Sequence, residues 1–207
     1  MKRQAKTRAW LHRHVHDPYV RQATAQGYRS RAAFKLIGID TRDRLLKPGM
    51  TVIDLGCAPG GWCQVAAERL QGRGQVIGVD LLPMAALAGV RFIQGDFTAA
   101  DTRAEIESAL GGRKADLVLC DAAPNISGVT VADQARSYAL AEEALAFAVA
   151  HLQPKGAFLV KVFQGSGFEA FVRLMRASFQ QVLVRKPEAS RDRSRELYLL
   201  GRELRQN

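Results

Sequence analysis

Three carboxylates stand at the ends of apolar runs that are typical of buried strands: Asp80, Asp96 and Asp121. Ligands of open parallel sheets bind beyond the carboxyl ends of the strands, so we expect these side chains to surround one crevice. Three carboxylates around a crevice would repel a pyrophosphate and favour a cationic nucleoside without phosphate. Asp80 follows Gly56 by 24 positions, which is the place of a carboxylate that accepts hydrogen bonds from ribose hydroxyls.

The glycine turn after the first predicted strand departs from the dinucleotide fingerprint G-x-G-x-x-G. Gly56 is in place, but Ala58 stands at the second glycine, where a pyrophosphate would approach the backbone closely. The helix start at Gly60 and Gly61 would direct free N–H groups at a carboxylate. S-adenosylmethionine, a nucleoside attached to an amino acid, fits this turn better than a dinucleotide. A plain α/β domain is the alternative, and the three acidic strand ends argue against it.

Lys161 lies inside the apolar run 158–163, FLVKVF. Burial of an unpaired ammonium group is costly, so a purely structural role for this lysine is disfavoured. We therefore expect Lys161 to act at a functional site. Asp121, by contrast, could cap a helix, and Asp96 could simply end a strand.

Short β-branched runs alternate with helical stretches along most of the chain. This alternation predicts an α/β fold, in which a doubly wound, mostly parallel seven-stranded sheet carries helices on both faces. Ser30 is the expected N-cap of the first helix of this fold. The last two strands could pair as an antiparallel hairpin at the sheet edge. The predicted strands are 51–56, 75–80, 90–96, 115–121, 156–163, 181–187 and 197–202, and the predicted helices lie near 31–37, 62–70, 101–110, 133–151 and 167–178.

Positive charge is concentrated at the two ends of the chain. The 207 residues hold 30 Lys or Arg and 20 Asp or Glu, a formal charge of +10. Residues 1–35 carry nine of the bases and one acid, and residues 173–207 carry nine bases and four acids. A mildly acidic body with two basic flanks suits a polyanion held by phosphate contacts, so nucleic acid is the favoured partner. A merely solvated charged surface is the alternative.

The basic flanks also suggest which residues contact nucleic acid. We expect residues 1–27 to form a basic N-terminal arm and residues 28–207 a single domain. In the segment 186–195, four bases would contact phosphates: Lys186, Arg191, Arg193 and Arg195. Tyr19 and Tyr28 are candidate stacking surfaces. The alternating His12, His14 and His16 lack a nearby carboxylate or thiol, so we expect RNA or solvent contact there and no metal.

Composition excludes several classes of protein. At 47% hydrophobic residues, with 18 Gly and 7 Pro, the chain is neither collagen-like nor disordered. No apolar stretch reaches the ~20 residues of a membrane span, and the charged N-terminus lacks the apolar region of a secretory signal. The three cysteines, Cys57, Cys63 and Cys120, lack CxxC spacing and suit buried thiols in a reducing compartment. We expect a cytoplasmic monomer.

Several stretches closely resemble the FtsJ/RrmJ (RlmE) family of ribosomal RNA large-subunit 2'-O-ribose methyltransferases. The resemblance runs from about residue 10 to residue 201, and the KVFQG and SRDRSRELY stretches are more specific than the glycine turn. Cys57, Cys63 and Ala122 depart from the usual family residues without removing a functional group. The matching stretches are YRSRAAFKL, DLGCAPGGW, DLLPM, QGDF, DAAPNISG, LVKVFQG and KPEASRDRSRELY.

The resemblance implies a function, a cofactor and a set of site residues. The implied fold is the methyltransferase sheet with a terminal antiparallel strand. The implied reaction is S-adenosylmethionine-dependent methylation of one uridine in the A loop of 23S rRNA, on the large ribosomal subunit. The implied catalytic residues are Lys35, Asp121, Lys161 and Glu196. The implied cofactor residues are Gly60, Trp62, Asp80, Asp96 and Asp121, to which the turn itself adds Gly56 and Gly61.

The role of Lys161 at the attacking oxygen has two possible forms. Lys161 could act as a base if burial and the Lys35 ammonium lowered its pKa, a change that Asp121 would oppose. It could instead stay charged and orient the ribose oxygen, while Glu196 holds Lys35 or the substrate. Two other functions stay open: a ribosome-assembly module with a vestigial site, and a tRNA methyltransferase. An mRNA-cap enzyme would need elements for which 207 residues leave no room.

Overall fold

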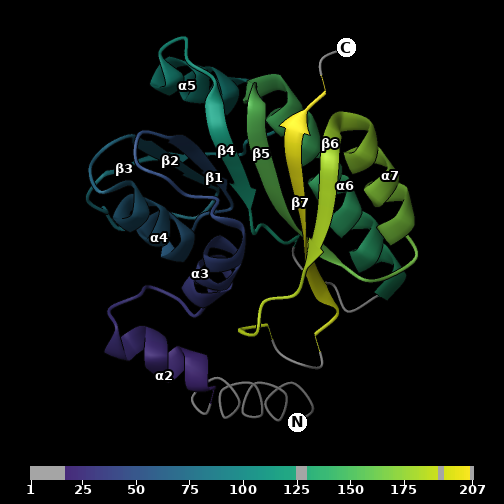
Figure 1. Cartoon of the computed structure of the whole chain (residues 1–207), viewed down its shortest axis with the longest axis horizontal. Coiled ribbons are helices and arrows are strands. Elements are labelled where there is room, and N and C mark those ends of the chain that lie inside the picture. The colour runs from purple at the N-terminus through teal and green to yellow at the C-terminus, as the bar shows by residue number, and fades with distance from the viewer. Residues whose placement is uncertain (1–16, 125–129, 191–193, 206–207) are drawn as a thin grey trace.

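A seven-stranded sheet forms the centre of the protein (Figure 1). The computed structural model describes residues 17–124, 130–190 and 194–205. The strand order is β3-β2-β1-β4-β5-β7-β6, and β7 runs antiparallel to both of its neighbours while the other paired strands are parallel. The strands are β1 (Thr51–Leu55), β2 (Gln75–Asp80), β3 (Val90–Gln94), β4 (Ala115–Cys120), β5 (Leu152–Phe163), β6 (Phe179–Arg185) and β7 (Glu196–Leu204).

Helices cover both faces of this sheet, which confirms the doubly wound α/β fold. One core cluster joins the sheet to α3 and α4, and a second joins the opposite face to α5, α6 and α7. Neighbouring residues of one strand point to opposite faces, so Val52 packs in the first cluster and Ile53 in the second. The helices are α2 (Pro18–Ala25), α3 (Ala32–Asp43), α4 (Gly61–Leu70), α5 (Ala100–Leu110), α6 (Thr130–His151) and α7 (Phe168–Ser178).

The last two strands pair as an antiparallel hairpin at the sheet edge, as predicted. β7 takes the inner place, between β5 and β6. The reason lies in burial: Tyr198, Leu199 and Leu200 of β7 are fully buried, whereas Val184 of β6 is 48% exposed. The more apolar strand therefore enters the sheet and places its side chains directly beside those of β5.

The start of α3 differs from the prediction. The helix begins at Ala32 and continues to Asp43, well beyond the expected end at residue 37. Ser30 does not cap it: the N-cap is Arg31, whose backbone is already helical, and no side-chain capping bond forms. The Ser30 hydroxyl instead lines a pocket described below. The sequence pattern is misleading here because a serine two residues before a helix looks like a cap whatever its side chain contacts.

The ends of several elements also shift. β5 begins at Leu152 rather than at residue 156, so that α6 leads directly into it. Residues 18–25, expected as part of an arm or a loosely held helix, form α2, which Asp17 caps by accepting a hydrogen bond from the Tyr19 amide.

Among the described helices, none is long and apolar enough to cross a membrane.

Candidate active site

Strand geometry gathers the charged residues on the face of the sheet that α3 and α4 cover. Lys161 of β5 stands opposite Tyr198 of β7 in the antiparallel register, so the two side chains share one face. Leu159 and Tyr198 pack in the core cluster of that face, and Phe158 and Val160 in the other. Lys161 therefore lies near the end of β5, with its side chain on the face of the sheet that α3 covers.

Two ion pairs form at this place. Lys161 Nζ lies 3.1 Å from Asp121 Oδ1, just after the end of β4, and it also donates a hydrogen bond to the Asp121 carbonyl. Lys35 Nζ, on α3, lies 2.7 Å from Glu196 Oε1 at the start of β7. The four side chains are only 9 to 17% exposed. The structure thus brings together all four residues that the family resemblance implied as a catalytic set.

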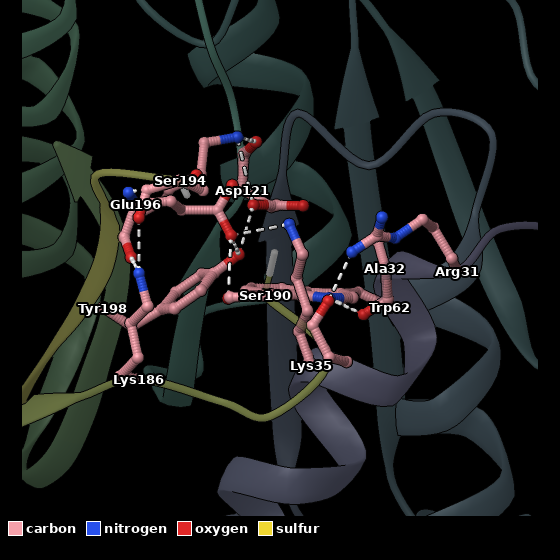
Figure 2. A network of polar contacts seen from close by, with 12 residues as sticks. Arg31, Ala32, Lys35, Trp62, Asp121, Lys186, Ser190, Ser194, Glu196 and Tyr198 are labelled. Atoms are coloured by element: carbon pink, nitrogen blue, oxygen red, sulfur yellow. Dashed lines mark hydrogen bonds and ion pairs between the residues drawn. The ribbon is translucent and has the colours of Figure 1, made fainter. Parts of the chain in front are cut away.

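Tyr198 connects the two ion pairs (Figure 2). Its hydroxyl lies 2.9 Å from Asp121 Oδ1 and 3.3 Å from Glu196 Oε1. The Lys35 ammonium lies 5.9 Å from the centre of the Tyr198 ring. Ser190 adds a hydrogen bond of 3.1 Å to the same oxygen of Glu196. A continuous polar network therefore runs from one lysine to the other.

The network shifts the pKa of two of its members. Burial raises the pKa of the Glu196 carboxyl, but the Lys35 ammonium and its hydrogen bond, together with the Lys161 ammonium and the Ser190 hydroxyl, outweigh burial, and the pKa is lowered. Burial, together with the carboxylates of Asp121 and Glu196, raises the pKa of the Tyr198 phenol well above its usual value. At neutral pH the site accordingly holds an ionised Glu196 and a protonated Tyr198.

Trp62 positions the helix that carries Lys35. Its indole N–H donates a hydrogen bond of 2.8 Å to the carbonyl of Ala32, in the first turn of α3. The same ring packs against Tyr198 with 5.7 Å between ring centres. Trp62 was predicted as a cofactor residue; it also fixes α3 to α4 and lines the pocket beside the network.

A pocket lies between the glycine turn, the end of β1 and the start of α3. Two of the residues that line it each carry a buried polar atom with no hydrogen-bond partner among the described residues: Ser30 Oγ and Asp54 Oδ1. Asp54 is fully buried, and its other oxygen accepts a hydrogen bond of 3.2 Å from the Cys63 thiol. The pocket is lined by Ser30, Ala32, Asp54, Gly56, Cys57, Ala58, Pro59, Gly61, Trp62 and Asp121.

These orphaned atoms suit the amino-acid end of S-adenosylmethionine. A free carboxylate oxygen can accept from an ammonium group, and a free hydroxyl can donate to a carboxylate. Burial raises the pKa of Asp54 to about 7, and the Asp121 and Asp80 carboxylates add to this shift. A cationic ligand would relieve the repulsion among these three acids. The residues present therefore fit this cofactor.

Glycine is required at two positions of the turn. Gly56 has a φ of +75°, and a Cβ there would lie 2.6 Å from the Cβ of Ala122. A Cβ at Gly61 would collide with the Ser30 hydroxyl. The absence of these side chains lets the segment after β4 and the segment before α3 close around the pocket.

The other predicted cofactor residues lie beside this pocket rather than in its lining. Asp80 accepts hydrogen bonds of 2.8 Å from the amides of Ala58 and Leu82, which places its carboxylate at the edge of the turn. Gly60 is the left-handed N-cap of α4. Asp96 is exposed after the neighbouring strand β3 and accepts hydrogen bonds from Thr98. The acidic strand ends thus follow the order of the strands along one rim.

The sequence pattern did not indicate Asp54 or Ser190 as residues of the site, it indicated Ser30 only as a helix cap, and it gave Tyr198 no role. Asp54 carries a signal that could have been used: an acid within the apolar strand 51–55 is as unusual as a lysine within 158–163. Tyr198 gave no such signal because a tyrosine in a strand is ordinary. Ser190 lies in an irregular loop and depends on tertiary contacts.

The predicted nucleic-acid contacts are only partly described. Lys186 donates hydrogen bonds to the carbonyls of Ser194 and Glu196 and so closes the base of the β6–β7 loop. Arg191 and Arg193 lie outside the described residues, as do His12, His14 and His16. Tyr19 and Tyr28 pack on Phe34, with ring centres 5.7 and 5.5 Å away, and Tyr28 also donates to Glu68. Within the described segments no cluster of three or more potential metal ligands occurs, and Cys57, Cys63 and Cys120 are free and buried.

The strand order with an antiparallel β7 is that of the Rossmann-like methyltransferase fold, and the pocket beside the first turn suits S-adenosylmethionine. The profile of the FtsJ-like methyltransferase family matches residues 28–204. The chain therefore belongs to this family, as the resemblance of the motifs predicted.

Close relatives and solved structures agree with this assignment. "Ribosomal RNA large subunit methyltransferase E" of Thiobacillus denitrificans is 62% identical over 94% of this chain and 88% of its own. The protein of the same name from Azoarcus sp. is 58% identical over 99% and 100%.

A Plasmodium falciparum protein assigned as a ribosomal RNA methyltransferase has a TM-score of 0.79 at 32% identity, covering 86% of this chain and 98% of that one. A Streptococcus mutans protein, assigned as a methyltransferase and solved with SAH (S-adenosylhomocysteine), has a TM-score of 0.53 at 12% identity. The match covers 81% of this chain and 95% of the Streptococcus mutans chain, and at this identity it shows a shared fold alone.

Proposed function

We propose that this protein transfers a methyl group from S-adenosylmethionine to a ribose 2'-hydroxyl of large-subunit ribosomal RNA. The observation that carries the proposal is the convergence of Lys35, Asp121, Lys161 and Glu196 beside the pocket at the glycine turn. Membership of the FtsJ-like family supports methyl transfer, and the names of relatives at 58–62% identity support the RNA substrate. We take the target to be one uridine of the 23S rRNA A loop.

The glycine turn and the acidic rim would hold the cofactor. Ser30 and the first amides of α4 would face its carboxylate, and Asp54 its ammonium group. Asp80 would accept hydrogen bonds from the ribose hydroxyls, and Asp96 would lie near the base. The bound cofactor supplies a methyl group on a sulfonium, which is a good leaving group. The protein therefore has to supply alignment and a path for the proton.

Lys161 is the group we place at the attacking oxygen. Its ammonium is anchored by the side chain and the carbonyl of Asp121, which leaves a third N–H to hold the ribose oxygen in line with the methyl group. We therefore favour the orienting role over the base role. Asp121, beside Lys161, is the carboxylate that would accept the hydroxyl proton as the new bond forms.

Lys35 and Glu196 would complete the substrate side of the site. Glu196 fixes the Lys35 ammonium, which can then donate to the ribose or to its phosphate. Tyr198 and Ser190 keep Glu196 in place. The basic N-terminal residues and the segment 186–195 would contact phosphates on either side of the reacting nucleotide.

The experiment is methyl transfer to large ribosomal subunits from cells that lack this gene. Subunits purified from these cells are incubated with the protein and methyl-labelled S-adenosylmethionine, and the modified nucleotide is mapped by mass spectrometry. We expect one 2'-O-methyluridine in the A loop of 23S rRNA. Transfer to tRNA alone, or binding to subunits without transfer, would refute the proposal. Free 23S rRNA in a parallel reaction shows whether the assembled particle is required.

A further inference from the structure

Arg29 connects two parts of the protein that are distant in sequence. Its guanidinium donates hydrogen bonds to the carbonyls of Ala85 at 2.7 Å, Ala86 at 2.6 Å and Pro59 at 3.3 Å. The first two belong to the irregular segment 81–87 that follows Asp80, and the third to the glycine turn before α4. One side chain thus joins the two segments that would enclose the cofactor from either side.

The backbone beneath this side chain is itself anchored on α4. The Gln64 side chain accepts a hydrogen bond of 3.1 Å from the Arg29 amide and donates one of 2.9 Å to the Gly27 carbonyl. Tyr28 adds a bond of 2.9 Å to Glu68, one helical turn further along α4. The guanidinium therefore projects from a fixed point, and it can fix the segments that it contacts.

The segment 81–87 has few other attachments. Leu81 and Leu82 are 66% and 65% exposed. Met84 and Leu87 pack against the core cluster of the α3–α4 face. In the part of the chain that the structure describes, the hydrogen bonds that reach the main chain of residues 83–86 come from Arg29. The Asp80 carboxylate joins Leu82, at the start of the segment, to Ala58 of the glycine turn. Without the guanidinium, only side-chain packing would hold residues 83–86 against that turn.

We infer that Arg29 is a positioning residue for the cofactor: it fixes the loop after Asp80 against the Pro59–Gly60 turn, so that the nucleoside site keeps its width before the ligand binds. A site that is ordered in advance loses less conformational entropy on binding. This inference rests on the proposed function, since it assumes that S-adenosylmethionine and its product bind at this turn.

Arginine is suited to this role by its shape. A guanidinium offers five N–H donors in a rigid planar fork, so it can serve several carbonyls of two segments at once. A lysine keeps the charge but presents a single donor group on a flexible stem. Arg29→Lys therefore separates positioning from electrostatics, because any contribution of the positive charge to RNA binding is retained.

The test compares Arg29→Lys with Arg91→Lys, the same substitution at an exposed position on β3. Binding of S-adenosylhomocysteine is measured by calorimetry on the full chain, and methyl transfer is measured at saturating cofactor. We expect the Kd of Arg29→Lys to rise about tenfold or more, since hydrogen bonds from a charged donor are lost. The kcat and the KM for the RNA substrate should stay within about threefold, and Arg91→Lys should match the wild type.

Hydrogen exchange supplies a readout that does not depend on activity. Amides of residues 82–87 should exchange faster in unliganded Arg29→Lys than in the wild type, while those of β1 and β4 stay protected. An unchanged Kd with unchanged exchange would overturn the inference, and so would a lowered melting temperature with an unchanged Kd. If the wild type itself fails to bind S-adenosylhomocysteine, the proposed function fails before Arg29 is at issue.

Discussion

At the scale of single residues, the Tyr198 hydroxyl links the two ion pairs of the site. It lies within hydrogen-bond distance of both Asp121 and Glu196, and each carboxylate holds one lysine. Removal of this hydroxyl takes away a donor that the two largely buried carboxylates share and allows both lysines to move. The geometry of the reacting groups thus depends on a side chain that touches neither cofactor nor substrate in our proposal.

We predict that Tyr198→Phe lowers the rate of methyl transfer about tenfold and leaves the affinity for S-adenosylhomocysteine unchanged. The free energy of unfolding should fall by about 1–2 kcal/mol, the usual cost of a lost buried hydrogen bond. Tyr138→Phe is the matched control, because Tyr138 donates to the Phe163 carbonyl from α6, on the opposite face. A control with the same loss of stability and the same loss of rate would contradict a positioning role for Tyr198.

The buried Asp54 carboxyl leads to a second prediction at the scale of single residues, which concerns the pH dependence of stability. Its pKa is raised from 3.8 to about 7 by burial and by the Asp121 and Asp80 carboxylates. Between pH 3.8 and about pH 7, Asp54 is therefore protonated in the folded protein but ionised in the unfolded chain. The stability due to this proton is fully present below pH 3.8 and is lost as the pH rises through 7.

Asp54→Asn removes this titration. In the absence of cofactor, the variant should gain stability relative to the wild type as the pH rises from 4 to 8, with a total change on the order of a few kcal/mol. Urea unfolding at several pH values measures the difference. Curves for the two proteins that stay parallel over this range would show that Asp54 keeps an ordinary pKa.

At the scale of elements, the sequence indicates most of the helices and strands, but not the order of the last two strands at the edge of the sheet. The strands β2 and β4 follow the predicted runs to within a residue, because short apolar runs bounded by turn residues are a strong signal. No local sequence pattern indicates that β7 lies inside the sheet, between β5 and β6, because its position depends on how much of each strand the helices bury. Yet that place decides that Tyr198 and Glu196 stand next to Lys161.

The position of α3 is a further property that the sequence does not reveal. Arg185 of β6 donates two hydrogen bonds of 2.7 Å to the carboxylate of Asp43 at the end of α3, and Arg202 donates to the Asp43 carbonyl. The partners are separated by 142 and 159 positions in the chain. These contacts fix the helix that carries Lys35 to the last two strands.

We predict that Asp43→Asn destabilises the protein by about 1–3 kcal/mol at pH 7, because a charged, two-bonded pair is lost. The hydrogen bond from Arg185 lowers the pKa of the Asp43 carboxyl. The stability from ionised Asp43 is therefore present above about pH 4 and is lost as the pH falls through the lowered value. Denaturation at pH 7 and pH 3 should show a smaller difference at pH 3. An equal difference at both would indicate loss of packing rather than of charge.

At the scale of the whole molecule, the separation of charge predicts how the two ligands respond to salt. The basic residues lie mainly in the two ends of the chain, whereas the rim at the strand ends carries carboxylates. RNA binding through phosphates releases counterions and weakens steeply as salt increases. The residues proposed to hold the cofactor include buried ones such as Asp54 and Trp62, so salt should screen its contacts little.

We predict that the KM for ribosomal subunits rises at least tenfold between 50 and 200 mM salt, a range over which several phosphate contacts have this effect. The Kd of S-adenosylhomocysteine should change less than threefold over the same range. Magnesium is held constant to keep the subunits intact. A subunit KM that does not respond to salt would mean that the basic flanks are a solvated surface and not an RNA interface.

The most direct test of the account is the chemical step in Lys161→Ala. Single-turnover methyl transfer to undermethylated subunits and binding of S-adenosylhomocysteine are measured on the same preparation, with Lys155→Ala, at the opposite end of β5, as the matched control. We expect Lys161→Ala to bind the product within about threefold of the wild type and to lose methyl transfer by about a thousandfold or more. Lys155→Ala should behave as the wild type. Methyl transfer retained in Lys161→Ala would contradict the role of the paired lysines.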